Sequence, residues 1–138
     1  MATITFYEKP GCINGEKQKA ILLKADNVLR CVNILTHLWK RDELLPFVAG
    51  KTAATMMNFT APAIKNGEIN PAALSFEQAI ALMLRDPLLI KRPLITVDGQ
   101  FIQGFDDQRL LPYLGGWGGR EDVITCPNLQ ALSCDEQR

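Results

Sequence analysis

The sequence predicts one α/β domain built on a mixed sheet of about four strands that is flanked by helices. Three patterns predict it: a strand–helix–strand unit near the start, a helical middle region, and a later β-hairpin followed by a short helix. The chain has 138 residues, of which 47% are hydrophobic and 22% are charged. These values are typical of a globular domain and exclude global disorder.

The first unit begins with a strand and a turn in residues 1–10, because Ile4 and Phe6 alternate with less apolar residues. A helix is expected over residues 13–24, with Ile13, Ala20 and Leu23 on its buried side. Residues 28–34 then carry apolar side chains on both faces of a second strand. A strand covered on both faces is expected in the middle of a sheet, with helices above and below it.

The middle region, residues 42–85, is expected to be helical with interruptions. Pro46 is placed near the first turn of a helix, where its missing N–H is not needed. Two prolines and a glycine break residues 60–71 into short helices and turns. Ser75 and Gln78 form a capping box at the start of the next helix.

The hairpin consists of residues 93–97 and 100–103, joined by Asp98-Gly99, which is a strong signal for a tight turn. A last short helix is expected over residues 106–113. We expect residues 114–138 to be a glycine-rich linker and a flexible C-terminal tail, either poorly ordered or docked through Trp117.

The charge balance excludes several classes of partner. Fifteen Lys and Arg residues balance fifteen Asp and Glu residues, which argues against a protein that binds nucleic acid or an anionic membrane through its charge. The longest purely apolar run, residues 79–84, is too short to span a bilayer. No signal peptide is recognised, so a cytoplasmic location with reduced thiols is expected.

Cys12 is the residue most indicative of chemistry, since it lies between the end of a strand and the start of a helix. Unpaired N–H groups at a helix N-terminus favour a thiolate and can bind an oxyanion. The loop around it contains Gly11, Ile13, Asn14 and Gly15, and its glycines allow close approach of a ligand. Two interpretations stay open: a nucleophilic thiolate, or a small buried cysteine at a strand–helix junction.

The other thiols are weaker candidates. Cys31 lies in a predicted strand and is most simply a core residue. Cys126 and Cys134 either resolve an oxidised Cys12 or are exposed thiols of the tail. No zinc-ligand spacing is present, so no metal site is expected. His37 is expected to be a surface or boundary residue without an acidic partner.

Two motifs that are far apart in the sequence resemble those of a known protein family. Residues 3–7, followed by a proline and by Gly11-Cys12 before a helix, resemble the N-terminus of the arsenate reductase (ArsC-like) family, a branch of the thioredoxin-like fold. The run Leu89-Ile-Lys-Arg-Pro-Leu-Ile95 resembles the second signature of that family. The resemblance covers residues 2–113, and we assign residues 1–113 to an ArsC-like domain. The Cys12 loop, residues 58–65 and the tail look most like the nitrogenase-associated proteins.

The resemblance implies roles for individual residues. Cys12 matches the nucleophilic cysteine, Arg92 matches an arginine that holds an oxyanion, and Pro93 matches a proline with a cis peptide bond facing the cysteine loop. Glutathione or glutaredoxin is implied as the external reductant, and no bound cofactor is implied. The remaining loop residues, Gly11, Ile13, Asn14 and Gly15, would form the anion-binding loop.

The chain also departs from the family. Arsenate reductases of this type use further arginines around the oxyanion, yet no Arg occurs between Asp42 and Leu84, and the aligned hairpin end reads Gln103-Gly104. The related Spx regulators carry a second cysteine where this loop has Gly15, so a disulfide within the motif is excluded.

Two functions are therefore expected from the sequence. The first is a thiol-dependent redox protein with one nucleophilic cysteine that glutathione or glutaredoxin resolves, associated with nitrogen fixation. The second is a non-catalytic interaction module of the nitrogenase system that keeps the ArsC-like fold. The retained Cys12 and Arg92-Pro93 favour the first, and the missing arginines favour the second.

Overall fold

A computed structural model describes residues 2–115 of the chain, and its centre is a four-stranded mixed sheet in the order β2-β1-β3-β4. The strands are β1 (Thr3–Glu8), β2 (Val28–Asn33), β3 (Leu94–Val97) and β4 (Gln100–Gln103). β1 pairs in parallel with β2 and antiparallel with β3, and β3 pairs antiparallel with β4. The predicted mixed sheet is confirmed. The prediction of a linker and tail beyond residue 115, including Trp117, lies outside the described residues.

The helix α1 (Ile13–Lys24) connects β1 to β2 and has the bounds that the sequence predicts. Its predicted inward face is wrong, because Ile13 and Leu23 are 44% and 55% exposed. The buried positions are instead Asn14, Gly15, Gln18 and Leu22. Leu22 joins a core with apolar residues of β1, β3 and β4, whereas the polar residues at the start of the helix border a cavity.

The predicted central position of the second strand is also wrong, since β2 forms one edge of the sheet. Val28 is 46% exposed, although its apolar character suggested burial. An edge strand has a neighbour on one side only and is covered less completely than a central strand. Apolar residues on both faces of a strand are therefore not sufficient evidence for a central position.

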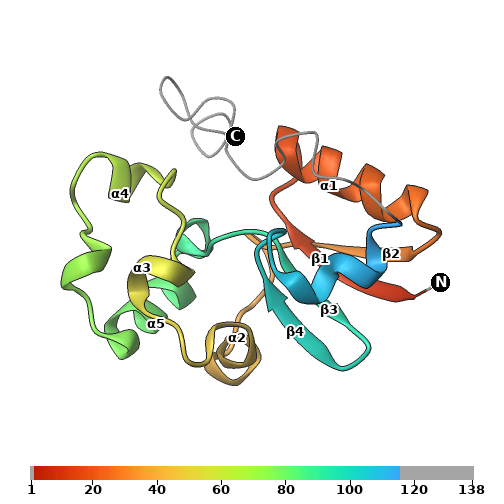
Figure 1. Cartoon of the computed structure of the whole chain (residues 1–138). Coiled ribbons are helices and arrows are strands. Elements are labelled where there is room, and N and C mark those ends of the chain that lie inside the picture. Colours follow the sequence, from red (N-terminus) through yellow and green to blue (C-terminus); the bar gives the residue numbers. More distant parts are fainter. Residues whose placement is uncertain (1, 116–138) are drawn as a thin grey trace.

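The helical region lies beside the sheet and forms a second core (Figure 1). It contains the helices α2 (Arg41–Val48), α3 (Ala53–Met56), α4 (Pro62–Lys65) and α5 (Phe76–Arg85), with short 3₁₀ turns η1 (Pro71–Ala73) and η2 (Pro87–Leu89). Tyr7 and Leu94 extend this core onto the sheet. Trp39 packs against it and donates a hydrogen bond from Nε1 to the Ile34 carbonyl at 3.0 Å.

One local prediction in this region fails. Pro46 lies in the second turn of α2, not in the first, because the helix begins at Arg41. A proline there cannot donate to the carbonyl of Asp42, four residues earlier. Both residues are exposed, so water has access to that carbonyl.

The predicted hairpin is confirmed, and Asp98 and Gly99 both adopt positive φ angles, 50° and 76°. This pair of angles is characteristic of the tight turn that fits the twist of two antiparallel strands. The expected last helix is the shorter 3₁₀ helix η3 (Gln108–Tyr113). Its Tyr113 hydroxyl donates to Asp98 Oδ2 at 2.6 Å and ties η3 to the hairpin turn.

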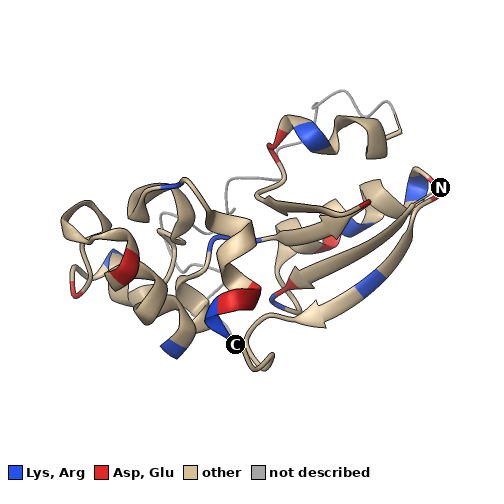
Figure 2. Cartoon of the chain, turned by 90° about the horizontal axis from the view of Figure 1, so that it is seen from below, with Lys and Arg blue, Asp and Glu red and all other residues tan. Residues whose placement is uncertain are grey.

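Basic and acidic positions are interspersed over the ribbon (Figure 2), in keeping with the balanced composition. Within the described part of the chain, no helix has the length and apolar character needed to cross a membrane.

The capping box of α5 gives a test of the fold. The Ser75 hydroxyl accepts from the Gln78 N–H at 3.1 Å, and Gln78 Oε1 accepts from the Ser75 N–H at 2.9 Å. We expect Ser75→Ala to lower the free energy of unfolding by about 1 kcal/mol. Urea denaturation would measure it. Ser75→Thr keeps the hydroxyl and is the control, and equal losses in the two variants would contradict the assigned cap.

Candidate functional site

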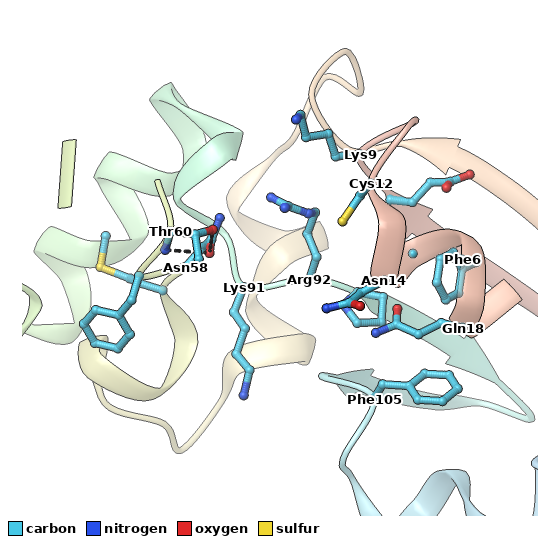
Figure 3. Close-up of a pocket in the computed structure, with 15 residues that line it drawn as sticks. Phe6, Lys9, Cys12, Asn14, Gln18, Asn58, Thr60, Lys91, Arg92 and Phe105 are labelled. Atoms are coloured by element: carbon cyan, nitrogen blue, oxygen red, sulfur yellow. Dashed lines mark hydrogen bonds between the residues drawn. The ribbon is translucent and has the colours of Figure 1, made fainter. Parts of the chain in front are cut away.

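A cavity of about 180 Å³ lies where the end of β1, the start of α1, the helical region and the segment before β3 meet (Figure 3). The sequence-predicted residues Cys12, Asn14, Gly15, Arg92 and Pro93 all line it. The structure therefore joins two motifs that are 80 residues apart in the chain, 12 and 92.

The remaining predicted loop residues do not line the cavity. Gly11 and the Ile13 side chain face outward, and both residues are exposed. Gly11 has φ +84°, a left-handed conformation that glycine adopts without strain, so its contribution is to turn the chain into α1. Cys126 and Cys134, the predicted resolving thiols, lie outside the described residues.

Cys12 is the N-cap residue of α1 and is partly buried. Its own N–H donates to the Lys9 carbonyl at 3.2 Å, and its carbonyl accepts from the Glu16 N–H at 3.0 Å. The Cys12 side chain makes no capping hydrogen bond to the helix. Cys12 therefore lies at the N-terminus of a 12-residue helix, where backbone N–H groups without helical partners can bind an anion.

Arg92 faces Cys12 across the cavity, and its guanidinium and the Cys12 thiol point into the same space (Figure 3). The Arg92-Pro93 peptide bond is cis, as the resemblance implies. Two backbone contacts fix this segment against the helical region: Lys91 N–H donates to the Met56 carbonyl at 3.2 Å, and Asn58 N–H donates to the Leu89 carbonyl at 2.8 Å.

Two lysines that sequence reasoning did not select also line the cavity. Lys9 is 5% exposed and lies in the Cys12 loop, and Lys91 precedes Arg92. The side chain of Lys91 extends away from Cys12 (Figure 3). Both lysines lie next to one of the two recognised motifs in the sequence, and this proximity could have identified them. Counting arginines alone underestimated the positive charge of the site.

Neutral polar groups form much of the remaining wall. Asn14 and Gln18 come from α1, and Asn58 and Thr60 come from the helical region. Asn58 is held firmly: its Nδ2 donates to the Leu88 carbonyl at 3.1 Å, and its Oδ1 accepts from the Thr60 hydroxyl at 2.7 Å. This wall offers amide and hydroxyl groups rather than further cations.

One carboxylate also borders the cavity. Glu8, at the end of β1, is buried and forms an ion pair with Lys19 at 2.9 Å. Partial burial opposes protonation of Lys19, but hydrogen bonds to Glu16 and then Glu8 outweigh it and raise the pKa of this lysine. The Lys19 charge therefore balances Glu8 at neutral pH, and the cavity keeps a positive character.

The predicted core position of Cys31 is wrong. His37 is half-buried, as expected of a boundary residue, and only its expected lack of an acidic partner is wrong. Cys31 is exposed, because β2 is an edge strand. Partial burial of the thiol, followed by the charge of Glu8, raises the pKa of Cys31. His37 does have an acidic partner, since its Nε2 lies 3.1 Å from Glu43 Oε2. That hydrogen bond lowers the pKa of Glu43. Within residues 2–115, no three His, Cys, Asp or Glu side chains form a metal-binding group.

Comparisons with known proteins identify relatives of this chain. A protein from Rhodospirillum rubrum, described as an uncharacterized 15.7 kDa protein in the draG 3′ region, is 37% identical over 129 residues, covering 93% of this chain and 90% of its own. The global transcriptional regulator Spx of Streptococcus mutans is 26% identical over 113 residues, covering 80% of this chain and 82% of the regulator.

A solved structure shares the fold. The arsenate reductase from Vibrio cholerae superposes with a TM-score of 0.67 at 22% identity, covering 82% of this chain and 98% of that one. The profile of the ArsC family matches residues 7–112, a span that includes both the Cys12 loop and the Arg92-Pro93 segment. The chain belongs to the ArsC family and has its thioredoxin-like fold.

Proposed function

We propose that this protein is a thiol-dependent redox protein in which Cys12 is the single nucleophile and Arg92 holds the anionic group of the substrate. One observation carries the proposal: Cys12, at the N-terminus of α1, and Arg92, before the cis-proline, line the same cavity. A helix terminus and a guanidinium both stabilise a thiolate, and the guanidinium can also bind a carboxylate or oxyanion in two-point contact.

The chemistry is thiol–disulfide exchange. The Cys12 thiolate attacks one sulfur of a substrate disulfide, a Cys12–substrate disulfide forms, and the other half leaves as a thiolate with the electron pair. A glutathione thiolate then attacks the Cys12 sulfur and releases the rest of the substrate. A second thiolate, from glutathione or from glutaredoxin, attacks the glutathione sulfur of the Cys12–glutathione disulfide. Cys12 leaves as the thiolate, and the two external thiols are left joined in a disulfide. Two external thiols thus supply the two electrons.

The polar wall supports a disulfide as substrate more than arsenate. A desolvated oxyanion with several charges needs several cations close to it. In this cavity Asn58 and Thr60 occupy the wall provided by the helical region, and the Lys91 side chain extends away from Cys12. Amide and hydroxyl groups instead suit the peptide bonds of glutathione or of a glutathione-linked protein.

We further place the reaction in the cytoplasm and its partner in nitrogen fixation. The balanced charge and the resemblance of the Cys12 loop and of residues 58–65 to nitrogenase-associated proteins support this assignment. The name of the Rhodospirillum rubrum relative, which places it in the draG 3′ region, supports it as well.

The first prediction compares two thiols in one molecule. In a Cys126→Ser/Cys134→Ser background at pH 7, iodoacetamide should alkylate Cys12 about tenfold faster than Cys31, since thiolate is the reactive form. The raised pKa of Cys31 keeps that exposed thiol protonated at neutral pH, and its rate should rise only in alkaline solution. Peptide mass spectrometry gives both rates. Equal rates at pH 7 would favour the non-catalytic interaction module.

The second prediction concerns Arg92. Arg92→Ala should slow Cys12 alkylation at pH 7 about three- to tenfold, because removal of a nearby cation lowers the thiolate fraction. Arg109→Ala is the matched control: it removes an equal charge from an ion pair with Asp107 outside the cavity, at 2.8 Å. An unchanged rate in Arg92→Ala, or equal slowing in both variants, would refute the assigned role of Arg92.

A further inference from the structure

Gln103, the last residue of β4, forms a buried junction between three parts of the chain. Its side chain is almost inaccessible, since the residue is 3% exposed. Its Nε2 donates to the Met56 carbonyl at 3.0 Å and to the Lys91 carbonyl at 3.1 Å. Its Oε1 accepts from Lys51 Nζ at 3.0 Å. One amide therefore links β4 to α3, to the loop before α3, and to the segment that carries Arg92.

These bonds act on the peptide that leads into Arg92. The Lys91 carbonyl belongs to the Lys91-Arg92 peptide unit, so its contact with Gln103 fixes the orientation of that unit. The Met56 carbonyl accepts both from Gln103 and from the Lys91 N–H, at 3.2 Å. Both backbone groups of Lys91 are thus held, and the direction in which the Arg92 side chain leaves the backbone is restricted.

The chemistry of this junction requires an amide. A carboxylate at position 103 would face two carbonyl oxygens, and an apolar side chain would leave the Lys91 carbonyl without this donor. The amide also gives Lys51 a neutral acceptor. Burial, followed by the nearby charge of Lys91, lowers the pKa of Lys51, so this lysine is already in a poorly solvated position.

We propose that Gln103 is a positioning residue that acts through Arg92 to keep the guanidinium directed at Cys12. The proposal rests on the thiol-redox function proposed above. Gln103 is not among the residues that line the Cys12 cavity, and its hydrogen bonds go to backbone and to Lys51, so it acts on the site through the Lys91-Arg92 peptide.

A double-mutant cycle tests this role in the full chain that carries Cys126→Ser and Cys134→Ser. Alkylation of Cys12 at pH 7 is measured in the parent, in Arg92→Ala, in Gln103→Met and in the combined variant. We expect Gln103→Met to slow alkylation about threefold in the parent and to have no further effect when Arg92 is already alanine. Gln108→Met, at an exposed position of η3, is the control and should leave the rate unchanged.

The outcomes separate the two proposals. If Arg92→Ala does not slow alkylation, the proposed function fails, and the role of Gln103 fails with it. If Arg92→Ala slows alkylation but Gln103→Met does not, or if the two effects multiply, only the positioning role is overturned. A lower unfolding midpoint in Gln103→Met with an unchanged rate at 25 °C would show a structural role and would also overturn it.

A second variant covers the case in which Gln103→Met does not fold. Lys51→Met removes the donor that orients the Gln103 amide and leaves both carbonyl contacts in place. We expect it to slow Cys12 alkylation about twofold in the parent and not at all with Arg92→Ala. Equal slowing in both backgrounds would contradict an action through Arg92.

Discussion

The antiparallel pairing of β1 with β3 is the constraint on which the candidate site depends. Tyr7 pairs with Leu94, so the end of β1 and the start of β3 lie side by side. The chain leaves β1 into the Cys12 loop and enters β3 from Arg92 and the cis-proline. A shift of this register by one residue would turn Phe6 and Ile95 out of the core and separate the thiol from the guanidinium. The buried apolar residues of both strands therefore hold the two parts of the site side by side.

Local signals in the sequence were sufficient to predict the elements whose bounds depend on neighbouring residues. The bounds of α1, the capping box at Ser75 and the turn at Asp98-Gly99 are set by short-range backbone requirements. The wrong predictions concern features that the tertiary arrangement determines, such as the place of a strand in the sheet. An apolar pattern on both faces predicted a central β2, but strand order made it an edge and left Cys31 exposed. Asn14 and Gln18 occupy the inner side of α1 because that side borders a cavity, which helical periodicity alone cannot reveal.

The candidate site was predicted in its main parts by the two motifs, and the structure adds what surrounds them. Cys12 and Arg92 were identified from the sequence, whereas Lys9, Asn58 and the Gln103 junction required the fold, since their relation to Cys12 spans separate elements. The result is a cavity with a thiol, a facing guanidinium, a buried lysine and a wall of amides. A guanidinium beside a helix N-terminus is an arrangement that can orient one anionic group. Among the described residues that line the cavity, Arg92 is the only arginine, and the Lys91 side chain extends away from Cys12.

The central claim is that Cys12 is the thiol at which the protein exchanges disulfides. The most direct measurement is the site of the first adduct when the reduced, full-length protein is treated with a substoichiometric amount of oxidised glutathione and mapped by peptide mass spectrometry. We predict glutathione on Cys12, with Cys31 still reduced, and loss of the adduct when glutaredoxin and glutathione are added. A first adduct on Cys31 or on the C-terminal cysteines, with Cys12 still reduced, would contradict the account.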